Sequence, residues 1–141
     1  MLFKRETNEE QNIVTYMFTN ENVENILYIQ RESSVYDKKD CIKNTIIWGV
    51  VQNNKFSLNI ESGNSNIFQL RNIIFQILDD FKKEFVSSET TEIYDITFSE
   101  FDKDLKEKYN FSYKSLVIKY GQENVIMEGK NSLIVLINVY N

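Results

Sequence analysis

The stretch of this sequence that most resembles a chemical site is "SGNSNIFQLRNIIFQILDDF", residues 62–81. A helix that begins after a glycine-rich turn can bind a phosphate group, because its first backbone N–H groups are free. Phosphate-binding loops contain several glycines and a Lys-Ser/Thr pair. The segment Ser62–Asn66 has one glycine, Gly63, and no such pair follows it. We therefore interpret Ser62–Asn66 as the turn and cap of a core helix, with a small-ligand crevice there as the alternative.

A second group of candidate residues is acidic and comprises Glu100, Asp102, Asp104 and Glu107. Carboxylates at this spacing could coordinate a hard cation. Lysines stand four positions after Asp102 and Asp104, however, and such pairs are typical of a solvated helix. The pattern therefore favours a solvated helix face, and we expect neither a metal site nor a cofactor.

The chain lacks the residues most used in nucleophilic catalysis. It has no histidine, and Cys41 is its single cysteine. A Ser-His-Asp or Cys-His nucleophile and a histidine-bearing zinc site are thereby excluded within this chain. Asp37 and Asp40 stand close to Cys41 in the sequence and would raise the pKa of its thiol, so we expect that thiol to be unreactive. The composition favours a protein that is not an enzyme.

The elements that must position these residues indicate one α+β domain over residues 1–141. Apolar residues at spacings of three and four predict a long helix over about 67–85 and a short helix over about 100–109. Alternating or continuously apolar segments predict about six to eight strands. We expect a mostly antiparallel sheet with the long helix packed on one face.

Individual segments carry more specific predictions. Asn53–Asn54 predicts a two-residue hairpin turn, because asparagine tolerates positive φ. The polar segment Arg31–Asn44 predicts a connection with a short helix. Ser112–Tyr120, with its aromatic and apolar residues, predicts a strand. Ser132–Tyr140 predicts a strand inside the sheet, because so apolar an edge strand would invite aggregation.

The second half of the chain resembles the C-terminal half of the GNAT acetyltransferases. The shared pattern is a strand, a helix, the strand "EIYDITF", the short helix "DKDLKEKYNF" and another strand. The phrase "EKYNF", Glu107–Phe111, corresponds to the family's Tyr-x-x-x-Gly-Phe-like ending of that helix. The family's Gln/Arg-x-x-Gly-x-Gly/Ala loop for the acetyl-CoA pyrophosphate has no counterpart in "SGNSNIF", and its N-terminal helices are not predicted. The resemblance implies an acyl-CoA-binding protein.

Charge and composition narrow the class of partner. The formal net charge is −5, which disfavours nucleic-acid binding and favours a basic protein surface. The longest apolar run, Leu133–Tyr140, is too short for a membrane span, and the first residues are too charged for a signal peptide. Heavy use of Asn, Ile and Lys, with no alanine, indicates an AT-rich bacterium, phage or plasmid. We expect the bacterial host's cytoplasm as the location.

Two functions follow from these observations. The first is a non-catalytic protein-binding module, such as a small acidic inhibitor, immunity or anti-defence protein. Its predicted partner-binding residues are Glu100, Asp104, Glu107, Tyr109 and Tyr113, which combine acidic charge with tyrosine anchors. The alternative is an atypical enzyme or binding protein for acyl-CoA or a nucleotide. The sequence leaves the oligomeric state open, a homodimer included.

Overall fold

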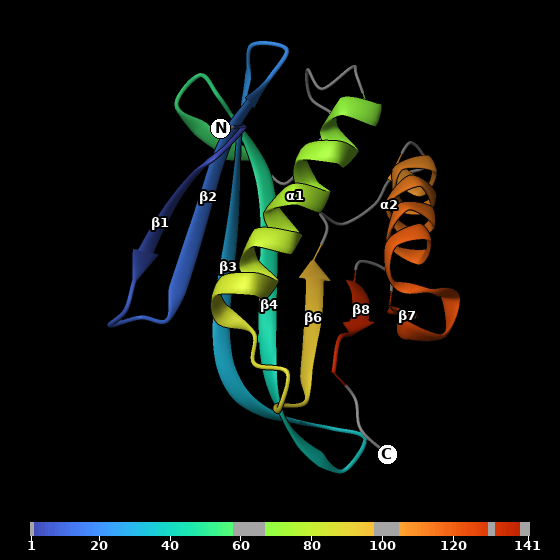
Figure 1. The fold of residues 1–141 in the computed structure, drawn as a ribbon. Helices are drawn as coiled ribbons and strands as arrows, with labels where there is room; N and C mark the ends of the chain where they lie inside the picture. Colours follow the sequence, from blue (N-terminus) through green and yellow to red (C-terminus); the bar gives the residue numbers. More distant parts are fainter. Residues whose placement is uncertain (1, 58–66, 98–104, 130–131, 139–141) are drawn as a thin grey trace.

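The computed structural model describes residues 2–57, 67–97, 105–129 and 132–138 of this chain. Its elements before the first helix are β1 (Lys4–Asn8), β2 (Ile13–Asn20), β3 (Val23–Tyr36), β4 (Lys39–Gln52) and β5 (Lys55–Ser57). The elements that follow are α1 (Ile67–Phe85), β6 (Glu92–Thr97), α2 (Leu105–Tyr120), a 3-10 turn (Gln122–Asn124), β7 (Val125–Glu128) and β8 (Ser132–Leu136) (Figure 1).

The strands form one eight-stranded sheet in the order β1-β2-β3-β4-β6-β8-β7, with β5 paired to β4. All neighbouring strands are antiparallel except β4 and β6, which are parallel. Parallel strands need a crossover connection, and α1 lies on that connection. The predicted α+β fold with a mostly antiparallel sheet is confirmed. So is the internal position of the last strand, since β8 lies between β6 and β7, although β8 ends at Leu136 and the strand was predicted to continue to Tyr140.

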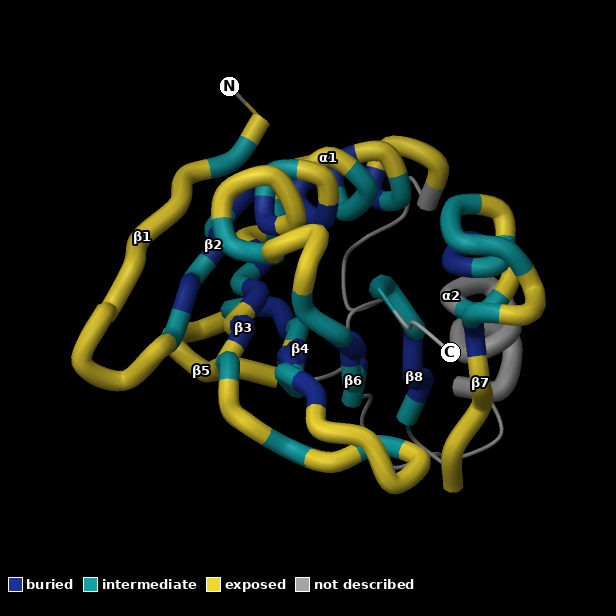
Figure 2. Tube along the Cα trace, turned by 60° about the horizontal axis from the view of Figure 1, so that its bottom comes forward, coloured by how far each residue is buried: buried dark blue, intermediate teal, exposed yellow. Residues whose placement is uncertain are grey.

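The two faces of the sheet differ in burial because side chains alternate along each strand. Between β2 and β3, the pairs Val14↔Ile29 and Tyr16↔Leu27 are fully buried, whereas the intervening pair Thr15↔Tyr28 is not. Figure 2 shows α1 lying across one side of β2, β3 and β4. We call the face under the helices the inner face and the opposite one the outer face. No helix in the described ranges covers the outer face.

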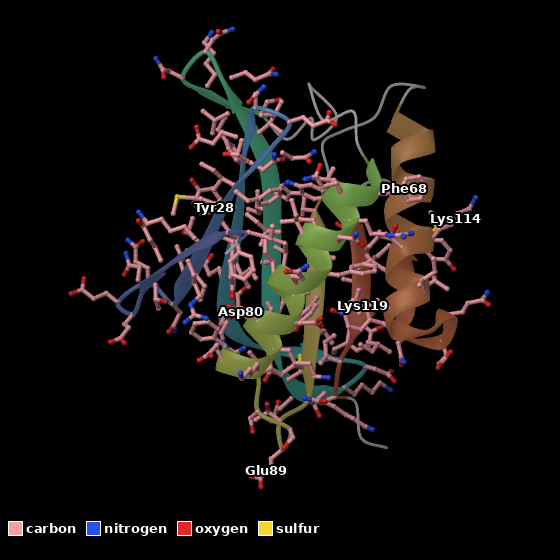
Figure 3. The ribbon with its side chains drawn as sticks, turned by 45° about the horizontal axis from the view of Figure 1, so that its top comes forward. Tyr28, Phe68, Asp80, Glu89, Lys114 and Lys119 are labelled. Carbon is pink, nitrogen blue, oxygen red and sulfur yellow. The ribbon has the colours of Figure 1, made fainter. Side chains whose placement is uncertain are left out.

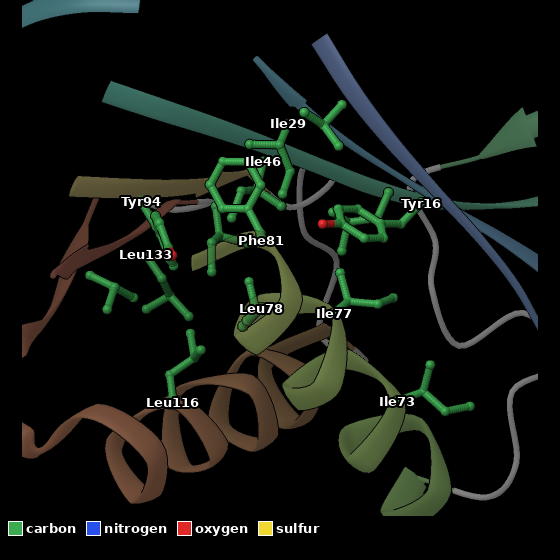
Figure 4. Close-up of a cluster of buried hydrophobic side chains, with 14 of the residues drawn as sticks. Tyr16, Ile29, Ile46, Ile73, Ile77, Leu78, Phe81, Tyr94, Leu116 and Leu133 are labelled. Atoms are coloured by element: carbon green, nitrogen blue, oxygen red, sulfur yellow. The ribbon is translucent and has the colours of Figure 1, made fainter. Parts of the chain in front are cut away.

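The core lies between the inner face and α1 (Figure 4). As the spacing predicts, Leu70, Ile77 and Phe81 are buried to 3% exposure or less, whereas Ile74 is only partly buried. The ring of Phe81 lies edge-on to that of Tyr94 from β6, with centroids 5.9 Å apart. Asp80 joins the helix to the first two strands, because Arg5 and the Tyr16 hydroxyl both donate to its Oδ2. The predicted long helix and its buried stripe are confirmed.

A buried carboxylate fixes the parallel pair of strands. Glu92, the first residue of β6, is fully buried, and its Oε1 accepts hydrogen bonds from Arg31 at 2.7 Å and from Asn44 at 3.1 Å. Its Oε2 accepts from the Ser87 backbone N–H at 3.2 Å and from the Thr90 hydroxyl at 2.8 Å. One side chain therefore joins β3, β4 and the loop after α1. We call these five residues the Glu92 network.

The structure corrects the prediction of a strand at Ser112–Tyr120, because α2 continues to Tyr120. The spacing of the core-facing residues in this segment is typical of a helix, because they follow the first one at intervals of three, four and seven. These residues are Tyr113, Leu116, Val117 and Tyr120. Their aromatic and branched character suited a strand equally well. Tertiary packing of that stripe decides the outcome in favour of the helix.

The prediction of a polar connection with a short helix at Arg31–Asn44 is also wrong. This segment forms the ends of β3 and β4, which meet at Asp37 and Lys38 with φ of 49° and 64°. Figure 1 shows this hairpin extending beyond the end of α1, so most of it lies outside the core and its strands can be polar. The predicted turn at Asn53–Asn54 is confirmed, with φ of 52° and 62°. The charged strand β1 was not predicted, because all five of its residues are exposed.

We predict that Glu92→Gln lowers the free energy of unfolding by about 3 kcal/mol, because it leaves the Arg31 charge in a mostly buried site without its counter-ion. Urea unfolding followed by Trp48 fluorescence measures this change. The control is Glu89→Gln, which removes an exposed carboxylate from the same loop. Equal stabilities for the two variants would contradict a stabilising role for the Glu92 network.

We also predict that Ile77→Ala costs about 2–5 kcal/mol, through lost apolar transfer and the cavity that remains. The adjacent exposed residue provides the matched control, Gln76→Ala, with a change within about 0.5 kcal/mol. Denaturant unfolding of both variants is the measurement. A loss below about 1 kcal/mol for Ile77→Ala would show that this stripe does not support the core.

Candidate functional site

The outer face carries a group of exposed and half-buried apolar side chains, which we call the aromatic patch. Its members come from β2, β3, β4 and β5 and are Met17, Ile26, Tyr28, Ile47 and Phe56. Tyr28 and Ile47 are each 37% exposed, and Phe56 is 43% exposed. The Tyr28 and Phe56 rings meet edge to face with centroids 5.7 Å apart. Figure 3 shows Tyr28 on the strands, well away from Phe68 near the start of α1.

Gly49 on β4 allows the Phe56 ring to lie against the strand. A Cβ atom added at Gly49 would come within 2.5 Å of Phe56 Cζ and 2.4 Å of the Ser57 carbonyl oxygen. These separations are far below ordinary contact distance, so only glycine fits beneath the ring without movement. The position of Phe56 over the outer face therefore depends on the absence of a side chain at residue 49.

An acidic hollow lies beside the aromatic patch, between the β1–β2 turn and β3. Its volume is about 690 Å³, and it is lined by Glu6, Thr7, Asn8, Glu9, Glu10, Gln11, Ile13, Thr15 and Tyr28. Three of these residues are carboxylates and none is a cation. The turn is ordered by the Gln11 backbone N–H, which donates to Asn8 Oδ1 at 3.2 Å. Tyr28 belongs to both the hollow and the aromatic patch, so the two features are continuous.

A second recess lies under the β3–β4 hairpin on the outer face, and we call it the hairpin pocket. Its volume is about 400 Å³, and its lining includes Asp95, Lys43, Glu128 and Tyr36. Lys43 Nζ lies 3.7 Å from Asp95 Oδ2, while the buried Asp95 Oδ1 has no hydrogen-bond partner. Burial raises the pKa of the Tyr36 hydroxyl, with smaller contributions from Glu128 and Asp37. This recess can accept a further hydrogen bond at Asp95, but it also contains a cation.

The partner-binding residues predicted from sequence are only partly covered by the structure. Glu100 and Asp104 lie outside the described residues. Glu107 and Tyr109 lie on the path of α2, of which only the backbone is described at those positions. Tyr113 is partly buried and packs against the main core. The structure therefore gives Tyr113 a packing role and does not bring the five residues together into a described surface.

The other sequence candidates can be placed more briefly. The turn Ser62–Asn66 lies outside the described residues. Cys41 is 6% exposed and packs with Ile93 and Ile134 beneath the hairpin. Burial raises the pKa of its thiol, as does Asp40, while Lys43 lowers it. A buried thiol with a raised pKa is a poor nucleophile, which agrees with the expectation of an unreactive cysteine.

Sequence reasoning missed the residues that line the outer face. The charged first residues of the chain argue against a signal peptide, but they also include Glu6, Glu9 and Glu10, which line the acidic hollow. Phe56 was recognised as part of an alternating strand, but alternation does not say which face of a sheet is covered. The one available signal was the run of carboxylates beside an alternating strand that contains Tyr28.

The outer face offers carboxylates and aromatic rings to a ligand. In the described ranges, no group of three or more Asp, Glu or Cys side chains is placed to hold a metal ion. None of the helices in those ranges has the length and apolar character that crossing a bilayer requires. An acidic hollow beside an aromatic patch can attract and desolvate a cationic side chain or a basic peptide.

Comparison with known proteins gave no family model, curated protein or solved structure that matches this chain. The order β5-α1-β6-α2-β7 follows the order of elements that the GNAT resemblance implies. That resemblance has no match to support it, and it does not enter the proposal below.

We predict that Gly49→Ala displaces the Phe56 ring and lowers stability by about 1–3 kcal/mol, because the added methyl group has no space. Nuclear Overhauser contacts between the Tyr28 and Phe56 rings, together with urea unfolding, measure both effects. The control is Thr45→Ala, which lies on the same face of β4 and makes the side chain smaller, so it introduces no steric clash. Retention of the ring contacts at unchanged stability in Gly49→Ala would contradict this account of Phe56.

Proposed function

We propose that this chain is a non-catalytic protein-binding module that accepts a basic segment of its partner on the outer face of the sheet. The observation that carries the proposal is the acidic hollow with three glutamates, no cation among its described lining residues and a wall formed by Tyr28. Roles of this kind include those of a small acidic inhibitor, an immunity protein or an anti-defence protein. Each of these acts by covering a surface of another protein.

The carboxylates of the acidic hollow would attract a positively charged partner. Glu6, Glu9 and Glu10 are exposed, and the one described ion pair among them is the exposed contact of Lys4 with Glu6 at 3.6 Å. Exposed pairs of this kind contribute little, so most of the negative charge remains available. Carboxylates on a rim accelerate encounter with a positively charged partner and select against acidic ones. The overall charge of −5 acts in the same direction.

The aromatic patch would supply the apolar contact with the partner. Tyrosine and phenylalanine supply most of the binding energy in many interfaces when they become desolvated at the centre. Tyr28 and Phe56 are already in contact with each other, so little side-chain freedom is lost on binding. A partner segment with a lysine or arginine for the hollow and an apolar residue for the patch would use both features.

We predict that a short peptide of alternating lysine and leucine binds this face, because it presents both kinds of side chain. The measurement is a titration followed by ¹H–¹⁵N NMR. Amide shifts should cluster in the β1–β2 turn and around Tyr28, and the affinity should fall as salt screens the carboxylates. The double variant Glu9→Lys, Glu10→Lys should weaken binding by about tenfold or more, since two attractions become repulsions.

Two further variants separate the outer face from other acidic surfaces. Glu84→Lys with Glu89→Lys changes the net charge by the same amount at exposed positions on α1 and the loop after it, and should leave binding unchanged. Asp104→Lys with Glu107→Lys tests the surface predicted from sequence. Loss of binding only in this last variant would overturn the outer-face proposal and return the site to α2. Equal losses of affinity in all three variants would show that the peptide responds to the net charge of the protein and not to a particular surface.

A further inference from the structure

The inner side of the sheet contains a small cavity that the proposed protein-binding face does not use. Its volume is about 50 Å³, and it lies between β3, β4 and β6 on one side and the two helices on the other. Its lining is Leu27, Ile46, Trp48, Arg71, Ile74, Phe75, Leu78, Ile96, Ser115 and Leu116. Figure 4 labels several of these residues where α1 and α2 face the sheet. Apart from Arg71 and Ser115, the lining is apolar or aromatic.

Arg71 is the unusual member of this lining. It lies on α1 between Phe68 and Phe75, with its guanidinium carbon 5.3 Å and 6.0 Å from the two ring centroids. Its Nε is buried and has no hydrogen-bond partner. A buried donor without an acceptor costs free energy unless a ligand or water satisfies it. The arginine as a whole is only partly buried, and it contributes to the lining of the cavity.

The other two arginines of the chain show what Arg71 lacks. Arg5 lies 2.6 Å from Asp80, and Arg31 lies 2.7 Å from the buried Glu92. Both guanidinium groups therefore have a carboxylate partner. The described residues provide no carboxylate for Arg71 and leave its Nε–H free, although the group lines a cavity. Arginine is the residue best suited to bind a planar carboxylate through two parallel hydrogen bonds.

We propose that Arg71 and this cavity form a binding site for a short aliphatic carboxylate. The carboxylate accepts hydrogen bonds from the Arg71 guanidinium, including Nε–H. The hydrocarbon chain enters the cavity against Leu78 and Leu116, and the Ser115 hydroxyl is available as a second donor. A phosphate fits less well, because the other described lining residues are apolar or aromatic and only Trp48 among them carries a side-chain N–H. The proposal is independent of the outer face, which lies on the opposite side of the sheet.

The size of the cavity limits the length of the hydrocarbon chain. A cavity of about 150 Å³ holds the six carbon atoms of benzene, so about 50 Å³ suits a chain of roughly two to three carbon atoms beyond the carboxyl group. Propanoate and butanoate match this volume. Longer straight chains would need the helices to separate, so affinity should pass through a maximum with chain length.

The test is a titration of the full chain with sodium butanoate, followed by NMR of the leucine and isoleucine methyl groups. We expect saturable shifts in the methyl resonances of Leu78, Leu116 and Ile74. Butan-1-ol, which has the same chain length without the charge, should bind about tenfold more weakly. This comparison uses the unaltered protein, so a folding defect cannot explain the difference.

Two variants provide a second test of the proposed carboxylate site. Arg71→Gln should weaken butanoate binding by about tenfold and leave butan-1-ol binding unchanged. Lys114→Gln removes a charge from an exposed position on α2 and should change neither. Equal binding of acid and alcohol would overturn the proposal and leave an apolar cavity without anion selectivity. Absence of saturable shifts in the lining methyl groups would show that the cavity takes no ligand of this class.

Discussion

The fold depends on keeping one buried negative charge fully paired. Glu92 lies where the chain returns from α1 to the sheet, and its carboxylate binds groups from β3, β4 and the loop after α1. A carboxylate removed from water is costly unless every lone pair has a partner. A shift of β6 relative to β4 would break these hydrogen bonds and leave the Glu92 carboxylate buried without partners. The Glu92 network therefore stabilises the parallel pairing of the two strands. That pairing in turn fixes α1 over the inner face.

Placing both helices on one side separates two kinds of surface. The inner face gains an apolar core, and its imperfect packing between α1 and α2 leaves the small cavity beside Arg71. The outer face remains in contact with solvent and carries carboxylates next to an exposed tyrosine and phenylalanine. The proposed protein-binding face and the proposed small-ligand cavity therefore lie on opposite sides of the sheet.

The sequence predicted those parts of the fold that depend on short-range patterns. The α1 stripe, the Asn53–Asn54 turn and the buried last strand each follow from spacing or from the conformations that single residues tolerate. Only the first part of α2 was predicted, because the residues of Ser112–Tyr120 suit a strand equally well. The Glu92 network could not be predicted, since Arg31 and Glu92 are distant in the sequence. The outer face was not predicted as a binding surface, because alternation along a strand does not say which sheet face the helices cover.

The single parallel pairing has a consequence for how the chain folds. From β1 to β5, each strand pairs with the next one along the chain, so these contacts close short loops. The β4–β6 register joins Ile42 to Glu92 across the whole of α1, and closing that loop costs about 2 kcal/mol more in entropy than closing a loop of about five residues. We expect the first strands to organise early and the β4–β6 contact to limit the folding rate. An interrupted chain that ends before β6 would then expose a partly formed sheet with an unpaired, apolar β4 edge.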